Sequence, residues 1–235
     1  MRRTRVAVWQ MEPRPRDADA NFAMIDKALS SRAATDADVF VAPEMFATGW
    51  MALNGQDPRP LKLPERVAKR AREHGTMIAT SLPVRRGNRN YNTFHVWGKD
   101  GRLLGVQDKI HLWAEESNET TPGRSPRAVT TPVGRVGGVI CYDVEFPEVT
   151  RRLAGQGAEL FLVPAAFYSP QSWDLVTRTR ALENGCFLAA ANQIGGDPSH
   201  PHNGQSRIVD PYGTVLAEVR GSKSGVVAAD LDPAR

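Results

Sequence analysis

One pattern of apolar residues occurs twice in this chain, and it limits the folds that the chain can adopt. The run Ala37–Phe46 is similar to Ala158–Phe167, and the run Phe94–Gly105 is similar to Ser206–Ala217. Short apolar runs bounded by turn residues are typical of buried strands, and the second pair contains Asp-Gly and Tyr-Gly, at which hairpins reverse. Each half is therefore expected to form strand, helix, strand, helix and strand, followed by a hairpin.

Helical segments are expected between these strands. Phe22, Ile25 and Leu29 recur at the spacing of one helix face. A second helix is predicted over residues 64–74, from a proline in its first turn to a stop at the following glycine. Two more are predicted, one beginning near residue 147 and one over residues 173–184. Two such α-β-β halves would pack sheet on sheet with the helices outside, which is a four-layer α-β-β-α sandwich of the α/β class.

The length and composition are those of a chain with one core. At 235 residues, 41% of them hydrophobic, the chain is long enough for one sizeable core and short for two, so residues 1–235 are expected to form a single domain. No apolar stretch approaches the ~20 residues that a membrane span needs. The segment Met1–Trp9 is too short and too polar for the core of a signal peptide. We therefore expect a cytoplasmic protein that does not span a membrane.

Charge and histidine content point to neither a nucleic-acid partner nor a metal. The net charge is +4, but the arginines are scattered and form no basic run interleaved with aromatic residues, so solvated faces explain them better. His200 and His202 lie in a loop rich in glycine and proline, yet no HExxH motif and no cysteine pair supplies the spacing of a metal site. We expect no metal and no cofactor.

A cysteine ends an apolar run in the segment Gly138–Glu148. The Pro-Glu pair that follows favours a helix start, so Cys141 is expected at a strand-to-helix turn. There a side chain can face a cleft while nearby backbone N–H groups remain available to bind a developing negative charge. A nucleophile is usually displayed in this way, although a lone cysteine after Val-Ile is most often a small core residue. The other cysteine, Cys186, lies within an apolar run and is interpreted as a core residue.

Two further strand ends carry polar side chains. Glu44 ends the apolar run 38–43, and in the repeat it corresponds to Ala165, so only the first half carries a carboxylate there. Lys109 follows the run 106–108. Each has an ordinary alternative, namely a turn or capping carboxylate for Glu44 and a solvated strand end for Lys109. The asymmetry between Glu44 and Ala165 favours a functional role for the glutamate.

Taken in chain order, these three segments resemble the nitrilase superfamily of carbon–nitrogen hydrolases. Its members carry a Glu-Lys-Cys triad in motifs similar to P-E-x-F-x-T-G, D-K-x-H-L and C-Y-D-x-x-F-P-E, which stand here at residues 43–49, 108–112 and 141–148. The later segments Arg180–Gly185 and Asp210–Gly213 are also similar to the family, so the resemblance covers nearly the whole chain. It implies the same α-β-β-α fold and a hydrolase of amide-type bonds.

The resemblance also implies a role for each residue of the triad. Cleaving an amide requires a nucleophile, an acid for the departing nitrogen and stabilisation of a tetrahedral oxyanion. Cys141 would form a thioester. Glu44 would take the thiol proton, pass it to the leaving nitrogen and then activate water, a role that requires a carboxyl pKa raised by burial. Lys109 would present its positive charge to the oxyanion, helped by backbone N–H groups around Tyr142.

A second glutamate is expected between the lysine and the Pro-Gly turn at residues 122–123. Family spacing favours Glu116, with Glu115 and Glu119 as close alternatives. If the loop were merely solvated, all three would be surface charges.

The residues after the cysteine bear on the substrate. True nitrilases resemble Cys-Trp-Glu at this point, whereas Cys-Tyr-Asp at residues 141–143 favours an amide over a nitrile. In omega-amidases of the family, the position of Glu145 is an arginine suited to a substrate carboxylate. A Glu145 that faces the pocket would repel an acidic substrate and favour a neutral or cationic one, as in the aliphatic and 5-aminopentanamidase-like amidases that this segment resembles. Alternatively, Glu145 pairs with Arg151 or Arg152 at the surface.

The expected reaction is hydrolysis of a small linear amide by water to a carboxylate and ammonia. An N-carbamoyl amine hydrolase and an omega-amidase would use the same triad, and a catalytically silent scaffold of this fold is an alternative of another class. A homodimer or higher homo-oligomer is expected. Aromatic residues near the strand ends are the candidates for the pocket walls: Tyr142, Trp113, Phe167 and Trp173, with Trp50 and Tyr168 beside them.

Overall fold

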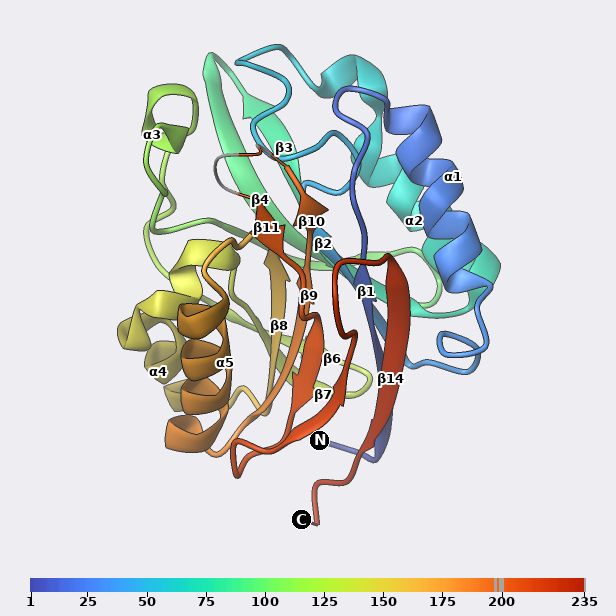
Figure 1. Cartoon of the computed structure of the whole chain (residues 1–235), viewed down its shortest axis with the longest axis vertical. Helices are drawn as coiled ribbons and strands as arrows, with labels where there is room; N and C mark the ends of the chain where they lie inside the picture. The colour runs from blue at the N-terminus through green and yellow to red at the C-terminus, as the bar shows by residue number, and fades with distance from the viewer. Residues whose placement is uncertain (197, 199–200, 235) are drawn as a thin grey trace.

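The computed structural model describes residues 1–196, 198 and 201–234. Two six-stranded sheets lie face to face between two layers of helices (Figure 1). Helices α1 (Ala18–Leu29) and α2 (Leu63–His74) cover the first sheet, and α4 (Pro147–Gly155) and α5 (Pro170–Asn184) cover the second. The predicted α-β-β-α sandwich is thereby confirmed.

The first sheet has the order β14-β1-β2-β3-β4-β5. Its central strands β1, β2 and β3 are parallel, and β3, β4 and β5 continue as antiparallel hairpins. The last strand of the chain returns to pair antiparallel with the first, with Thr4 opposite Leu231. The strands are β1 (Thr4–Gln10), β2 (Val39–Glu44), β3 (Met77–Arg86), β4 (Arg89–Trp97), β5 (Leu103–Asp108) and β14 (Gly225–Leu231).

The second sheet has the order β13-β12-β9-β8-β7-β6, with β7, β8 and β9 parallel. A separate antiparallel pair, β10 and β11, follows β9. The β6–β7 hairpin was not predicted from the sequence, because its strands are short and rich in threonine and glycine. The strands are β6 (Ala128–Thr131), β7 (Gly134–Gly138), β8 (Leu160–Ala165), β9 (Phe187–Asn192), β10 (Ile194–Gly195), β11 (His202–Asn203), β12 (Arg207–Val209) and β13 (Val215–Glu218).

The helix boundaries follow local chemistry. The side chain of Asp17 caps α1 by accepting the Ala20 N–H. Helix α2 ends at Gly75, whose φ of +59° is the left-handed conformation that glycine adopts without strain. Helix α5 starts before the predicted residue 173, because Pro170 fills its first position. The remaining helical turns are α3 (Glu116–Glu119) and two 3-10 turns at Arg59–Leu61 and Cys141–Glu145.

Two apolar cores hold the layers together. One lies between the sheets and contains fully buried residues such as Val41, Phe94 and Leu162. The other lies between the first sheet and its helices, where Phe22, Ile25 and Leu29 present the predicted apolar face of α1. Because the sheets pack directly against each other, the carboxyl ends of β2 and β8 meet at one edge of the sandwich.

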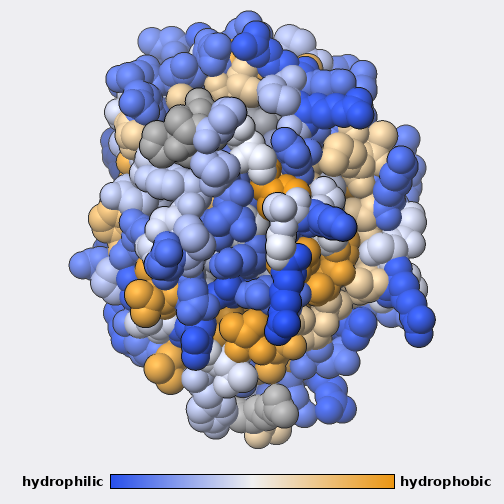
Figure 2. All heavy atoms as spheres, viewed as in Figure 1, coloured by the Kyte–Doolittle hydropathy of each residue, from blue (hydrophilic) through white to orange (hydrophobic). Residues whose placement is uncertain are grey.

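The surface carries no continuous apolar band on the face shown in Figure 2, where hydrophobic side chains form separate patches among hydrophilic ones. None of the described helices has the length and apolar character required to cross a bilayer. The large apolar side chains that are exposed are Leu103, Val106, Leu175, Leu182 and Tyr212.

Candidate active site

Three strand ends bring Glu44, Lys109 and Cys141 together. Glu44 is the last residue of β2, Lys109 follows β5, and Cys141 begins the 3-10 turn after β7. All three side chains are buried, although glutamate and lysine are almost never fully buried without a partner. The residues come from both sheets, so the site depends on the packing of the whole sandwich.

Cys141 is held in an unusual backbone conformation. Its φ is +46°, in the left-handed region, where a non-glycine residue is strained by about 1–3 kcal/mol. The turn is closed by the Asp143 N–H, which donates to the Ile140 carbonyl at 2.9 Å. As predicted from the sequence, the thiol lies between a strand and a helix, because α4 begins only six residues later at Pro147.

Lys109 lies between two carboxylates. Its Nζ is 2.9 Å from Oε1 of Glu44 and 2.7 Å from Oε2 of Glu116, and all three side chains are inaccessible to solvent. An ammonium has three N–H donors. Two are used by the carboxylates, and since Lys109 also lines the cavity described below, the third can serve a substrate.

Among the three glutamates considered from the sequence, the structure places Glu116 in this cluster. Its carboxylate also accepts the Trp113 N–H at 3.1 Å, which fixes it at the start of α3. Glu115 is exposed at the rim of the cavity, and Glu119 faces a different surface groove. The interpretation of all three as surface charges therefore fails for Glu116.

Asn92, which was not predicted from the sequence, completes the cluster. Its Nδ2 donates to Oε1 of Glu44 at 2.6 Å and to Oε1 of Glu116 at 3.1 Å. Asn92 is fully buried in β4, and asparagine is depleted in strands, so a buried strand asparagine was the available signal. Lys109 and Asn92 both bind Oε1 of Glu44, so the second oxygen, Oε2, is available to a proton.

The electrostatic environment keeps the thiol neutral at rest. Burial and the adjacent Glu44 carboxylate raise the pKa of Cys141 well above its usual value, and they outweigh Lys109 and the Ala166 backbone hydrogen bond, which lower it. Burial, with the charge of Glu116, also raises the pKa of Glu44, against the opposing effect of Lys109. A carboxylate with a raised pKa is a stronger base, so Glu44 is suited to take the thiol proton.

Lys109 remains a cation despite its burial. Burial alone disfavours the ammonium, but Glu44 and Glu116 together raise its pKa well above the ordinary value. The site therefore contains a fixed positive charge that does not titrate near neutral pH, beside a thiol and a base.

Asp143 connects the segments that carry the cysteine and the lysine. It lies two residues after Cys141, is fully buried, and accepts the backbone N–H of His111 at 2.8 Å and of Ile110 at 3.3 Å. The His111 ring nitrogen Nδ1 lies 3.0 Å from the same carboxylate. Because residues 110 and 111 directly follow Lys109, Asp143 fixes the lysine segment against the turn that carries Cys141.

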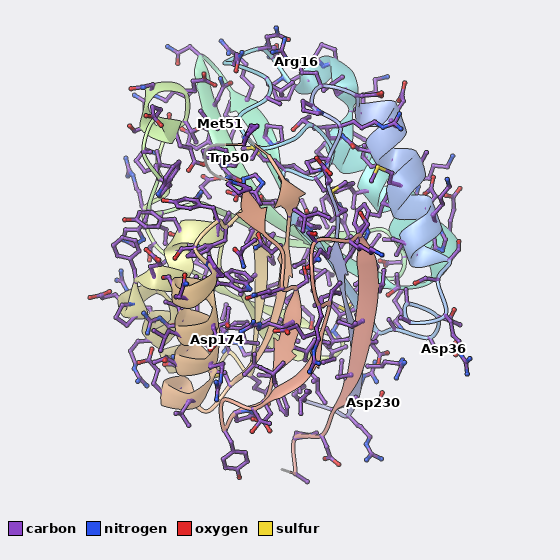
Figure 3. The ribbon with its side chains drawn as sticks, in the orientation of Figure 1. Arg16, Asp36, Trp50, Met51, Asp174 and Asp230 are labelled. Carbon is purple, nitrogen blue, oxygen red and sulfur yellow. The ribbon has the colours of Figure 1, made fainter. Side chains whose placement is uncertain are left out.

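A cavity of about 560 Å³ opens onto Cys141 and Lys109. Of the predicted wall residues, the structure places these around it: Trp50, Trp113, Tyr142, Phe167 and Tyr168. The rings of Trp50 and Trp113 lie 5.6 Å apart, and Trp50 also contacts His202 of β11 edge-on. In Figure 3, Trp50 and Met51 lie beside the short β10–β11 pair, at one end of the sandwich.

Trp173 was predicted to contact the substrate, but the structure places it elsewhere. It does not line the cavity, because its indole projects from α5 into the interior, is fully buried and packs against Phe167 with ring centroids 5.1 Å apart. Its ring N–H donates to the Gln205 carbonyl. Trp173 therefore supports the wall from behind.

Glu145 lines the cavity and is only partly exposed. Its Oε1 accepts the Ser172 hydroxyl at 2.5 Å. In the part of the chain that the structure describes, it forms no ion pair with Arg151 or Arg152, and Arg151 instead donates to the Glu183 carbonyl. The alternative of a surface ion pair is thus not the arrangement seen.

No cluster of three or more potential metal ligands occurs among the described residues. His202 lines the cavity, and burial lowers its pKa to about 4, so it is neutral near pH 7. Its predicted companion in the histidine-containing loop, His200, lies outside the described residues.

Comparison with known proteins identifies the family of this chain. The model of the carbon–nitrogen hydrolase family matches residues 5–235, and the chain belongs to that family. This confirms the family and the class of enzyme predicted from the sequence.

Relatives and solved structures point to one branch of this family. The chain is 34% identical to the 2-oxoglutaramate amidase of Bacillus subtilis (strain 168), over 83% of this chain and 78% of the relative, and 32% identical to the omega-amidase NIT2 of Danio rerio, over 99% and 89%. A mutant of the amidase from Nesterenkonia sp. AN1, with acrylamide added to its active-site cysteine, superposes with a TM-score of 0.91 at 31% identity, over 98% of this chain and 94% of that one.

Proposed function

We propose that this chain hydrolyses a small linear amide to a carboxylate and ammonia through a thioester on Cys141. The observation that carries the proposal is the buried group of thiol, carboxylate and ammonium at the base of one cavity. The amidases among its relatives support the bond type. Water is the second substrate.

In the acylation step, Oε2 of Glu44 takes the thiol proton as the sulfur attacks the amide carbonyl carbon. The carbonyl electron pair moves to oxygen, and the free donor of Lys109, with backbone N–H groups at the turn after Cys141, stabilises this oxyanion. When the tetrahedral intermediate collapses, the C–N bond breaks and Glu44 gives its proton to the departing nitrogen. The products of this half-reaction are ammonia and the thioester.

In the deacylation step, Glu44 takes a proton from water, and the resulting hydroxide attacks the thioester carbonyl. Collapse of the second intermediate breaks the C–S bond, the carboxylic acid leaves, and the proton returns to sulfur. The raised pKa of Glu44 suits both directions of transfer, because burial disfavours its charged form. Lys109 remains charged throughout.

For the substrate, the cavity favours a neutral or cationic amide. Its lining contains two carboxylates, those of Glu115 and Glu145. Among the described residues, Lys109 is the only lysine or arginine that lines it, and Lys109 is already paired with two glutamates. Aromatic rings of Trp113 and Tyr142 offer faces to an apolar or cationic chain. The names of the relatives favour an omega-amidase, whose acidic substrate is the second candidate.

Ammonia release from a panel of compounds tests the proposal: 5-aminopentanamide, butyramide, α-ketoglutaramate, N-carbamoylputrescine and an aliphatic nitrile. Turnover of the amides and not of the nitrile is expected, with 5-aminopentanamide or butyramide ahead of α-ketoglutaramate. A preference for α-ketoglutaramate would contradict the proposed neutral or cationic substrate and would favour the omega-amidase activity. No turnover of any member by folded protein would favour the silent scaffold.

A matched pair of variants separates the role of Glu145 from general surface charge. Glu145→Gln is expected to reduce the preference for 5-aminopentanamide over butyramide by about tenfold or less, because a partly exposed charge pair contributes about 1 kcal/mol. Glu148→Gln removes an exposed carboxylate on α4 and should leave the preference unchanged. Equal effects of both variants would contradict a pocket role for Glu145.

We further propose that residues 1–235 act as one catalytic domain in the cytoplasm and assemble as a homodimer or higher homo-oligomer. Leu175 and Leu182 support assembly, because they lie seven residues apart on one face of α5 and are 66% and 56% exposed. Light scattering that shows a monomer at working concentrations would remove the oligomer.

A further inference from the structure

A second cavity, of about 440 Å³, lies against β5 on the side of the β3–β4 hairpin, and its lining shares no residue with the cavity of Cys141. Four arginines line it: Arg86, Arg89, Arg124 and Arg127. They come from the β3–β4 hairpin and from the segment of residues 121–127, which are separated in sequence. The fold therefore brings arginines that are far apart in the sequence to one cavity.

The charge of this cavity is largely uncompensated. Asp108 is the only carboxylate on its described lining, and it is already bound by Arg86 and by the Thr93 hydroxyl. The side chains of Arg89, Arg124 and Arg127 form no ion pair or hydrogen bond with any described residue. Three unpaired guanidinium groups around one cavity repel one another, so an anion placed between them is favoured.

The cavity is also well formed. The Gly123 N–H donates to the Lys109 carbonyl at 2.7 Å, and a Cβ at Gly123 would lie 2.5 Å from the Asp108 carbonyl oxygen, so only glycine allows this close approach. The Arg86 guanidinium stacks 3.9 Å from the centre of the Tyr91 ring. These contacts hold two sides of the cavity in place before any ligand arrives.

We propose that this cavity binds a phosphate-bearing small molecule. Guanidinium groups present planar, forked donors that match phosphate oxygens. The volume is that of a site for a small molecule. The proposal goes beyond the amidase activity and does not depend on it.

Isothermal titration with inorganic pyrophosphate at constant ionic strength tests the proposal. The double variant Arg124→Gln/Arg127→Gln is expected to bind about 100-fold more weakly than wild type, tenfold for each guanidinium lost. The control Arg14→Gln/Arg32→Gln removes the same net charge at exposed arginines outside the cavity and should bind as wild type does. All four positions are exposed, so unchanged melting temperatures are expected.

Two results would overturn the proposal: no pyrophosphate binding by wild type, or equal weakening by both double variants. Modification by phenylglyoxal provides a second readout, mapped by mass spectrometry. Pyrophosphate should protect Arg124 and Arg127 and leave Arg14 and Arg32 reactive. If a single-stranded RNA binds through Arg124 and Arg127 while pyrophosphate does not, the small-molecule class is wrong.

Discussion

Glu116→Gln is the substitution that most sharply tests the buried charge cluster. The carboxylate of Glu116 receives Lys109 at 2.7 Å and the Trp113 N–H at 3.1 Å through one oxygen, and Asn92 at 3.1 Å through the other. A glutamine can keep the first two bonds with its carbonyl oxygen. Its amide nitrogen then faces the Asn92 donor, and the negative charge is lost.

The substitution mainly affects the pKa of Glu44, because the negative charge of Glu116 helps to raise it. Two carboxylates roughly 5 Å apart repel by about 3 kcal/mol at an effective dielectric constant of 20. Losing that repulsion lowers the pKa of Glu44. The acid limb of kcat/KM should therefore move to lower pH, and kcat should fall about 100-fold, because Glu44 becomes a weaker base and Lys109 shifts toward it.

The assay is a pH profile of ammonia release for wild type, Glu116→Gln and Glu119→Gln. Glu119 is the matched control, because it lies on the same short helix but faces another groove. Its variant should reproduce the wild-type profile. An unshifted acid limb and unchanged kcat in Glu116→Gln would refute the coupling between Glu116 and Glu44.

Two further predictions concern other buried groups. Asp143→Asn replaces the carboxylate that accepts the N–H groups of residues 110 and 111 by an amide. The kcat of this variant should fall at least about tenfold with little change in KM. A changed KM with wild-type kcat would contradict a role of Asp143 in positioning Lys109. For His95, burial lowers the pKa to about 4, against about 6.5 when unfolded. The unfolded chain therefore takes up the proton first, and stability should fall by about 3 kcal/mol between pH 6.5 and pH 4. Urea unfolding of His95→Gln should lack this part of the loss, and an identical pH dependence would contradict it.

Much of the fold was predictable because the chain repeats its pattern. Buried strands β2 and β8 are apolar runs with clear ends, and the hairpin glycines Gly101 and Gly213 have φ of +76° and +77°, as their turns require. The β6–β7 hairpin was missed because its strands are short and lack a strong apolar pattern. Its pairing depends on the adjacent strand β8, which local sequence does not encode.

The site was predictable where a residue stands out in its own segment or, as for Glu116, where it matches the spacing of a family motif. Glu44 and Cys141 end apolar runs, Lys109 ends a predicted strand, and the structure brings all three together. Asn92 and Asp143 were missed, because their role comes from hydrogen bonds to segments distant in the chain.

Tertiary packing also explains why Trp173 was wrongly predicted to line the cavity and why the arginine cluster was not predicted. The side chain of Trp173 lies behind the cavity wall, since its orientation depends on how α5 packs. The arginines around the second cavity appeared scattered for the same reason, because tertiary packing alone brings them to one place.

The most direct test of the central claim is the rate of ammonia release by Cys141→Ala on the best amide of the panel, compared with wild type at equal melting temperature. We expect a loss of at least about 10³-fold, because no other described group in the cavity can form the thioester. Turnover within tenfold of wild type by the folded variant would show that Cys141 is not the nucleophile.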